Sequence, residues 1–298
     1  MKVRVPATVA NLGPGFDTLG VAIRMHLEVE IEPRRDTVEI MVEGEGAEQL
    51  PADDSNLVIR SMNMFFDHVA RRPAGYAVRV RNPIPLASGL GSSAAAVVGG
   101  LTVARAMTGR AVPQSEMVAL ATEMEGHPDN VLPALVGGLV VSYRGDAGLR
   151  HLRLAASDRL VPILVVPASG LATEKAREVL PDTVSFADAQ FSLARSALVV
   201  GALLAGAGGD TLADAMRDRL HEPPRLELMP ETAAVHSELR AAGLPVALAG
   251  AGPSLLAVVP RPETATRAEQ IRRVCRARRA GWRVFVSEWE PEGARVLS

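Results

Sequence analysis

The chain has 298 residues, of which 48% are hydrophobic and 22% charged, so a sizeable core in one large or two ordinary domains is expected. Its 32 Lys and Arg nearly balance 34 Asp and Glu, for a formal net charge of −2, and aromatic residues make up only 3%. This composition gives no electrostatic or stacking reason to expect a nucleic acid or an anionic membrane as partner. The single cysteine, Cys275, excludes an intrachain disulfide.

The N-terminal segment lacks the apolar run of a signal peptide. The longest apolar stretch, residues 196–206, is shorter than the roughly 20 residues that span a bilayer. We therefore expect a cytoplasmic protein in a reducing compartment.

The first half of the chain alternates strand-like and helix-like segments. Period-two alternation and short β-rich runs predict strands at 2–6, 28–32, 37–43, 76–81 and 139–143. Apolar residues at helical spacing, together with helix-ending glycines, predict helices at 56–69, 92–107 and 114–125.

The second half begins near residue 157 and also contains both strand-like and helix-like segments. The sequence predicts strands at 161–166, 246–248, 254–259 and 282–287. It predicts helices at 173–180, 186–205, 211–220, 231–241 and 264–279. No fixed-period repeat or obvious flexible linker separates the halves, so we infer two closely packed α+β domains, residues 1–156 and 157–298.

The segment from Ser88 to Ala94 (SGLGSSA) is the strongest local indication of a ligand. Pro83 and Pro85 stop the preceding strand, and small residues from Ser92 onward start a helix. Glycines let the backbone turn its N–H groups inward, and the helix N-terminus adds unpaired donors and a positive dipole end. The pattern indicates a phosphate site, although a well-capped turn would also explain it. It is neither a Walker A nor a GxGxxG sequence.

Four segments resemble motifs of the GHMP superfamily of small-molecule kinases. They are 85–95 (PLASGLGSSAA), similar to its ATP-binding signature; 5–17 (VPATVANLGPGFD), similar to its N-terminal motif; 125–134 (EGHPDNVLPA) followed by Gly137-Gly138; and 250–254 (GAGPS), similar to its third motif. The motifs occur in the family's order and span nearly the whole chain. The N-terminal and HPDN forms resemble the homoserine kinase branch.

The resemblance implies a two-domain GHMP kinase fold. Its N-terminal ATP-binding domain would be like domain 2 of ribosomal protein S5, and its C-terminal domain would be a ferredoxin-like α/β domain. The implied activity is transfer of the ATP γ-phosphate, with Mg²⁺, to the hydroxyl of L-homoserine, giving O-phospho-L-homoserine in threonine biosynthesis. A homodimer is left open. The alternatives are a GHMP kinase acting on a mevalonate-like alcohol and a non-catalytic ATP-binding sensor.

The resemblance also implies which residues contact ATP and Mg²⁺. They are Asn56 on the adenine side and the loop Pro85, Leu86, Ala87, Ser88, Gly89, Leu90, Gly91, Ser92, Ser93, Ala94 and Ala95. The metal ligand is expected to be Glu123, in the helix before HPDN, with help from Ser92 or Ser93. Glu125 is the alternative, because residues two apart on a helix face in different directions and only one of the two can point to the metal.

The implied substrate-binding residues are Asn11, Asp17, His127, Thr173, Arg177 and Arg225. Asp17 would pair with the substrate ammonium, and Arg225 would form a fork for its carboxylate. Two catalytic accounts stay open for the HPDN segment: Asp129 could accept the hydroxyl proton, or Asn130 could orient the hydroxyl while the γ-phosphate takes the proton. Without the resemblance, Asp17 would be read as a turn former and each arginine as half of a surface ion pair.

Overall fold

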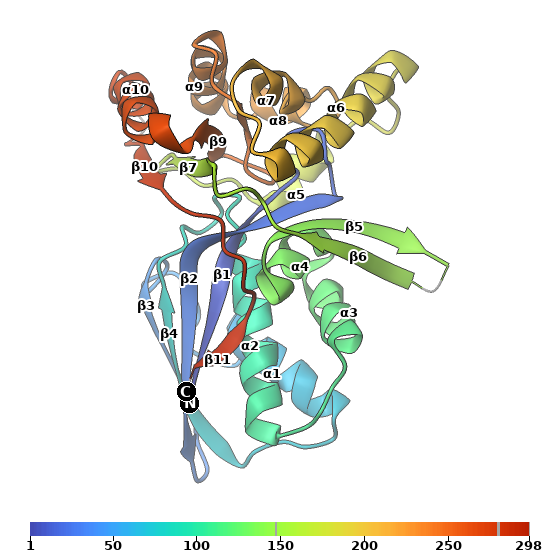
Figure 1. Cartoon of the computed structure of the whole chain (residues 1–298). Coiled ribbons are helices and arrows are strands. Elements are labelled where there is room, and N and C mark those ends of the chain that lie inside the picture. Colours follow the sequence, from blue (N-terminus) through green and yellow to red (C-terminus); the bar gives the residue numbers. More distant parts are fainter. Residues whose placement is uncertain (147, 279–280, 298) are drawn as a thin grey trace.

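The computed structural model describes residues 1–146, 148–278 and 281–297. Two mixed α/β halves are stacked, and a hairpin projects to one side of them (Figure 1). The lower half is built on a sheet with the strand order β11-β1-β2-β4-β3, in which β5 pairs with β2 and β6 pairs with β5. Its strands are β1 (Lys2–Ala10), β2 (Leu19–Arg34), β3 (Val38–Gly44), β4 (Gly75–Asn82), β5 (Leu139–Gly145), β6 (Gly148–Leu154) and β11 (Arg295–Leu297).

Helices cover one face of this sheet (Figure 1). They are α1 (Leu57–His68), α2 (Ser92–Thr108), α3 (Gln114–Glu125) and α4 (Pro128–Val136). Helix α2 is rich in Ala, Gly and Val because it runs through the core between the sheet and α1. At Gly100, an added Cβ would lie 2.4 Å from the carbonyl oxygen of Val58 in α1, so the two helices approach as closely as only glycine permits.

The upper half has an antiparallel sheet with the order β10-β7-β9-β8. Its elements are β7 (Leu160–Val166), α5 (Thr173–Glu178), α6 (Phe186–Ala205), α7 (Asp210–Ala215), α8 (Glu222–Glu227), α9 (Pro230–Ala241), β8 (Val246–Leu248), β9 (Leu255–Pro260), the 3₁₀ turn η1 (Arg261–Glu263), α10 (Thr264–Arg276) and β10 (Arg283–Val286). With the helices between β7 and β8 taken together, this is the β-α-β-β-α-β succession of a ferredoxin-like domain. The predicted two-domain α+β fold class is confirmed.

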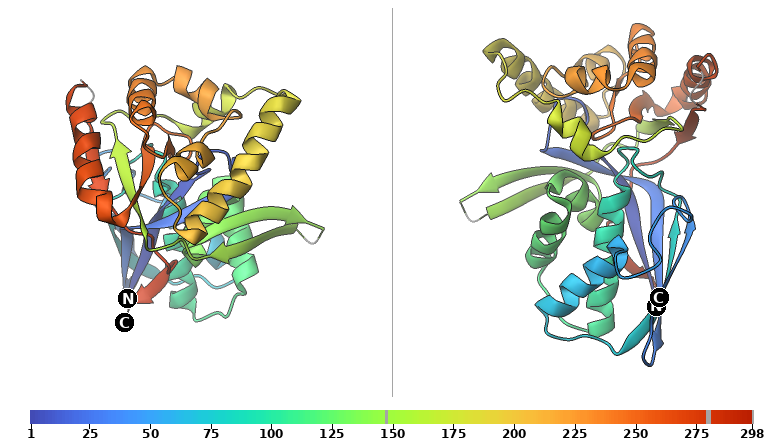
Figure 2. Two further views of the ribbon diagram at one scale, coloured as in Figure 1. Left: turned by 45° about the horizontal axis from the view of Figure 1, so that its top comes forward. Right: turned by 180° about the vertical axis from the view of Figure 1, so that it is seen from behind.

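The last strand returns to the first sheet. Strand β11 pairs antiparallel with β1, Val296 opposite Val3, and Figure 2 shows both termini at the same end of the molecule. Trp289 forms a bridge to Ile23 of β2 on the way. The predicted range 157–298 therefore contains a C-terminal segment that completes the other half, and three residues of β11 were too few to signal this in the sequence.

Several further segments differ from the prediction; strand β2, for example, spans Leu19–Arg34, where only 28–32 was predicted. Strand β6 was not predicted, because its GLRHLRL sequence does not alternate regularly. The helix predicted at 211–220 ends at Ala215 instead. The carboxylate of Asp218 accepts the backbone N–H of Leu220, His221 and Glu222 at 2.9, 2.7 and 2.9 Å, which turns the chain and starts the separate helix α8. The end of the helix predicted at 264–279 falls on Arg279, outside the described residues.

A buried carboxylate anchors the strand that leads to the domain junction. Glu222 accepts the backbone N–H of Leu248 in β8 at 2.7 Å, and its second oxygen lies 3.3 Å from Arg240 and 3.6 Å from His236. Burial alone would raise the pKa of Glu222, but the hydrogen bond and charge of His236, with Arg240, outweigh it and lower the pKa. The charged form is thus the one that the fold stabilises.

We expect Glu222→Gln to lower the free energy of unfolding by about 3 kcal/mol near neutral pH, because it leaves a buried arginine without its anion. A carboxyl whose pKa is depressed by folding contributes stability above its unfolded pKa and loses it as the pH falls through the folded value. The difference between wild type and variant should therefore be the same at pH 7 and pH 6 and shrink in acid. Urea unfolding monitored by circular dichroism checks this, and a gap that widened in acid would contradict it.

Candidate active site

A cavity of about 370 Å³ lies where the two halves meet. The first half contributes β1, the loop before α2 and the start of α4, and the second half contributes α5, α8 and the turn after β8. One group of lining residues is apolar: Leu27, Val42, Leu50, Leu57, Val58, Val80 and Ala96. The other group is polar and includes every residue predicted to bind the substrate: Asn11, Asp17, His127, Thr173, Arg177 and Arg225. Residues from distant parts of the sequence thus converge on one site.

The glycine loop before α2 is held from both sides. Leu90 accepts the backbone N–H of Thr8 in β1 at 3.1 Å, and Ser88 accepts that of Ser254 at 3.1 Å. A Cβ at Gly89 would lie 1.9 Å from the carbonyl oxygen of Ala249, and a Cβ at Gly91 would lie 2.0 Å from the Thr8 hydroxyl. Both glycines have positive φ, +81° and +68°. The loop therefore needs glycine for its conformation and for its packing.

The N-terminus of α2 opens toward the cavity. Its N-cap residue is Gly91, and among the described residues no side chain caps the helix. Ser92 and Ser93, the first two helical residues, line the cavity. Uncapped N–H groups, the positive end of the dipole and two hydroxyls together form an anion site suited to phosphate.

Not every residue predicted to contact ATP lines the cavity. Leu90, Ala94 and Ala95 are fully buried in the hydrophobic core, so only their backbone groups can serve a ligand. Ser88 is buried and donates to the carbonyl of Pro85 at 2.7 Å. Six other predicted residues of the loop do line the cavity, namely Leu86, Ala87, Gly89, Gly91, Ser92 and Ser93, whereas Pro85 does not.

Asn56 lines the cavity as a helix cap. Its Oδ1 accepts the backbone N–H of Val58 at 3.0 Å, and its Nδ2 donates to the carbonyl of Pro51 at 2.7 Å. Asn56 thus ties the segment carrying Leu50 to the start of α1.

The two candidate metal ligands lie in different places. Glu125, the last residue of α3, lines the cavity and accepts a hydrogen bond of 2.5 Å from the Ser93 hydroxyl. Burial raises the pKa of the Glu125 carboxyl, against the opposing effect of Ser93. Glu123 is exposed and does not line the cavity. The structure therefore corrects the expectation that Glu123 points to the phosphate loop. Only one of the two glutamates faces the loop, as the helical geometry requires, and that residue is Glu125.

The HPDN segment forms the start of α4, with His127 as its N-cap residue. His127 Nδ1 lies 2.8 Å from Asp129, and the Asn130 side-chain oxygen accepts the Thr8 hydroxyl at 2.8 Å. Burial would lower the pKa of His127, but the hydrogen bond and charge of Asp129, helped by Glu125, raise it. Asp129 thus favours the protonated form of His127, and the Asn130 amide is oriented by β1.

Asp17 and Arg177 form a two-pronged ion pair, with oxygen–nitrogen distances of 3.0 and 2.8 Å. Both side chains are 36% exposed, so the pair is accessible from the cavity. Asp17 and Asn11 have positive φ, +53° and +71°, which Asp and Asn tolerate better than most residues. Asn11 holds this loop by accepting the Asp17 N–H at 3.0 Å and donating to the Gly250 carbonyl at 2.9 Å.

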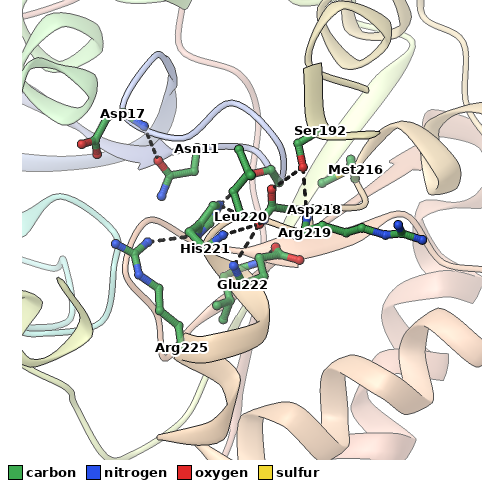
Figure 3. A network of polar contacts seen from close by, with 12 residues as sticks. Asn11, Asp17, Ser192, Met216, Asp218, Arg219, Leu220, His221, Glu222 and Arg225 are labelled. Carbon is green, nitrogen blue, oxygen red and sulfur yellow. Dashed lines mark hydrogen bonds and ion pairs between the residues drawn. The ribbon is translucent and has the colours of Figure 1, made fainter. Parts of the chain in front are cut away.

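Arg225 is buried, with 2% of its surface exposed, yet among the described residues its hydrogen bonds go to neutral groups. It donates to the carbonyls of Ala176 at 3.0 Å and Gly250 at 3.2 Å, and it lies 3.0 Å from Nδ1 of His221 (Figure 3). Burial, together with the like charge of Arg177, lowers the pKa of the Arg225 guanidinium. A desolvated cation with neutral partners beside a cavity is suited to bind an anionic ligand.

Two models of one protein family match the sequence: "GHMP kinases N terminal domain" over residues 56–138 and "GHMP kinases C terminal" over residues 200–278. The homoserine kinase of Streptomyces avermitilis is 38% identical over 100% of this chain and 95% of its own length. That of Caldanaerobacter subterraneus subsp. tengcongensis is 40% identical, with the same coverage of 100% and 95%. The chain belongs to the GHMP kinase family, in its homoserine kinase branch.

Solved structures agree. The homoserine kinase from Cytophaga hutchinsonii superimposes with a TM-score of 0.86 at 28% identity, covering 100% of this chain and 97% of that one. The mevalonate kinase from L. major shares the fold with a TM-score of 0.73 at 16% identity, covering 98% of this chain and 97% of that one. Membership in the family makes the chain an ATP-dependent small-molecule kinase.

Several site residues of this GHMP kinase were not found from the sequence. Asn82 donates to the Ser92 hydroxyl at 3.2 Å, but an Asn before a proline reads as a strand end. Thr8 supports both Gly91 and Asn130, but it lies inside a strand. His221 bonds to Arg225 from the N-cap position of α8; its place just before the Glu-Pro-Pro-Arg segment was the available signal.

Proposed function

We propose that this kinase transfers the γ-phosphate of ATP to the side-chain hydroxyl of L-homoserine, giving O-phospho-L-homoserine for threonine biosynthesis. One observation carries the choice of substrate: the polar group of cavity residues combines a carboxylate, Asp17, with two arginines, Arg177 and Arg225. An α-amino acid has a cation and an anion on one carbon, and this set of charges matches both. The relatives named homoserine kinases support the same choice.

The Asp17–Arg177 ion pair gives a way to admit the substrate. When no substrate is bound, the Asp17 and Arg177 side chains neutralise each other. An incoming ammonium group replaces Arg177 as the partner of Asp17, and the carboxylate takes the freed Arg177 together with Arg225. Asp17 and Arg177 each have an opposite charge as partner before and after binding, and Arg225 gains the anion that it lacks in the unbound site. Thr173, at the N-terminus of α5, lies beside Arg177 and is assigned to the same end of the substrate.

ATP is assigned to the remaining part of the cavity. We assign the adenine ring to the apolar residues around Leu50 and Leu57. Asn56 holds this side of the cavity in place through its hydrogen bond to the Pro51 carbonyl. The phosphates then reach the N-terminus of α2, where Ser92 and Ser93 lie. This places the γ-phosphate between the loop and the proposed homoserine site.

We assign Mg²⁺ to Glu125 with Ser92 or Ser93. Among the described residues no group of three or more His, Cys, Asp or Glu side chains is arranged to hold a metal. A site with one carboxylate fits Mg²⁺, which usually takes one or two carboxylates and completes its shell with water and substrate phosphates. Bound Mg²⁺ would neutralise charge on the phosphates during transfer.

For the transfer step we favour Asn130 as the residue that orients the substrate hydroxyl. Its oxygen is occupied by Thr8, which leaves its amide N–H groups for the cavity. The hydroxyl oxygen attacks the γ-phosphorus as the bond to ADP breaks, and its proton passes to a γ-phosphate oxygen. Asp129, paired with His127, supports the local charge in this account and is not the proton acceptor. We also propose a cytoplasmic setting for the reaction.

The function is tested by ADP release in a coupled assay with three acceptors. We expect turnover with L-homoserine and none above background with mevalonate. L-Homoserinol, which lacks the carboxylate, should have a kcat/KM lower by about 10- to 100-fold, because charged hydrogen bonds contribute about 1.5–3 kcal/mol each. Phosphorus NMR of the product identifies the phosphate ester. Turnover of mevalonate in place of homoserine would favour the alternative kinase, and ATP binding without any turnover would favour the sensor.

The metal assignment is tested with Glu125→Gln and its matched control Glu123→Gln. We expect Glu125→Gln to lower kcat by about 100-fold or more and to require more Mg²⁺, because it removes the carboxylate beside Ser93. Glu123→Gln should stay near the wild-type rate, since its side chain is exposed and outside the cavity. Circular dichroism establishes that both variants fold. The reverse pattern would restore the choice made from the sequence.

A further inference from the structure

His221 is a buried histidine that does not line the cavity but contacts an arginine that does. It is 1% exposed and is the N-cap residue of α8, four positions before Arg225. Figure 3 shows its ring beside the Arg225 guanidinium, at the centre of the polar contacts that surround the start of α8. The proposed transfer of phosphate gives this imidazole no part, so its role has to follow from its contacts.

The two ring nitrogens of His221 have opposite roles. Nε2 lies 2.7 Å from the Gly13 carbonyl oxygen, which can only accept, so Nε2 carries the hydrogen. Nδ1 lies 3.0 Å from Nη1 of Arg225, which can only donate, so Nδ1 offers its lone pair. The two contacts together select one neutral tautomer, because a doubly protonated ring has no lone pair for the arginine. The neutral ring thus connects the loop that carries Asp17 to α8.

Three contacts occupy one side of the Arg225 guanidinium. Its Nε donates to the Ala176 carbonyl at 3.0 Å, and its Nη1 faces both His221 and the Gly250 carbonyl, the latter at 3.2 Å. Arginine has five N–H groups, so these contacts use the one on Nε and the two on Nη1. Within the described residues Nη2 makes no hydrogen bond, and Arg225 lines the cavity. Nη2 is therefore the group that this arginine offers to an anionic ligand.

Neighbours outside the pair fix the position of the His221 ring. The ring of Phe16 stacks on it, with 5.2 Å between centroids and 26° between the ring planes. The Phe16 centroid also lies 5.2 Å from the guanidinium carbon of Arg225, so one aromatic ring contacts both members of the pair. The backbone N–H of His221 donates to the Asp218 carboxylate at 2.7 Å. His221 is thus held by groups other than Arg225 and can restrain that arginine.

A neutral partner leaves the charge of Arg225 available to a ligand. A carboxylate in the place of His221 would orient the guanidinium equally well but would neutralise it. Arg177 shows that arrangement, because Asp17 accepts from it at 2.8 and 3.0 Å. The imidazole and the two carbonyls instead supply Arg225 with the hydrogen bonds that burial takes from it, without adding a negative charge.

We infer that His221 is a positioning residue, whose neutral imidazole holds the Arg225 guanidinium with Nη2 directed at the substrate carboxylate. The inference rests on the proposed function, because it takes homoserine as the substrate. A long side chain that is held in its binding orientation loses less rotamer freedom when the ligand arrives, so the restraint favours binding. His221 acts on substrate capture and touches neither the substrate nor the reacting phosphate.

Two amide side chains separate the two hydrogen bonds of His221. Asn places an amide oxygen near the position of Nδ1 and can accept from Arg225. The longer Gln places its amide near the position of Nε2, so it can keep the bond to Gly13 but not the bond to Arg225. His236→Gln is the matched control, because His236 accepts from Nε of Arg240 at 3.0 Å with the same four-residue spacing, and neither of these residues lines the cavity.

We expect His221→Gln to raise KM for L-homoserine about tenfold, with kcat and KM for ATP within about twofold, because the arginine that binds the carboxylate is no longer held in position. His221→Asn should stay within about threefold of the wild-type KM, because it keeps the hydrogen bond to the guanidinium. His236→Gln should lower Tm without changing KM for L-homoserine. The coupled assay for ADP gives the kinetic constants, and circular dichroism gives Tm.

L-Homoserinol separates positioning of Arg225 from general damage to the cavity. This acceptor lacks the carboxylate, so it gains nothing from a correctly placed Nη2. His221→Gln should therefore lower kcat/KM about tenfold for L-homoserine but less than about twofold for L-homoserinol. Equal losses with the two acceptors overturn the inference. His221→Leu, which fills the same space and accepts no hydrogen bond, should behave as His221→Gln does and replaces it if the Gln variant does not fold.

The failure of this inference can be told from the failure of the proposed function. A wild-type enzyme that does not use L-homoserine refutes the proposed function and this inference with it. If the wild type uses L-homoserine and His221→Gln leaves its KM unchanged, only this inference is overturned. The same holds if His221→Asn is as impaired as His221→Gln, because the bond to the arginine would then not be the one that matters.

Discussion

The close packing of other residues against the backbone of Gly89 and Gly91 is the constraint on which the site depends. The loop passes between the Thr8 side chain in β1 and the Ala249 carbonyl after β8, with distances that leave no room for a side chain. These two contacts hold the halves together at the loop, direct the N-terminus of α2 toward the cavity, and leave Thr8 within reach of Asn130. A methyl group at Gly89 would push the loop away from the Ala249 carbonyl, and one at Gly91 would push it away from Thr8.

The second half completes what the first cannot supply. The phosphate end of the cavity is made by elements of the first half, but the arginines come from α5 and α8. Holding Arg225 in a desolvated place among carbonyl and imidazole groups opposes stability, since its charge lacks a close anion within the described residues. The carboxylate of Glu222, three residues earlier, is fully paired, so it stabilises the fold and offsets the cost of burying Arg225. Helix α8 thus carries one charge that is paired within the protein, on Glu222, and one that is available to a ligand, on Arg225.

The sequence predicts the helices and strands whose apolar residues recur at a regular spacing. It also predicts the site residues that lie together in one continuous motif. Helices 56–69, 114–125 and 186–205 agree with α1, α3 and α6 to within a residue or two, and the loop of 85–95 was located by its glycines. What could not be predicted depends on the third dimension. The choice between Glu123 and Glu125 turns on how α3 is rotated against α2, and no local pattern encodes that rotation. His221 and Thr8 act through contacts 208 and 122 residues away in sequence.

Helix α6 shows why an apolar period is ambiguous in a sequence. A stretch with apolar residues on all sides reads as a buried core helix, and only the structure shows that half of its surface faces outward. Its inner Ser192 bonds to Asp218, the carboxylate that caps α8 and thereby sets the direction of His221 and Arg225. The inner face of α6 is thereby connected to the substrate site through the hydrogen bonds of Ser192, Asp218, His221 and Arg225.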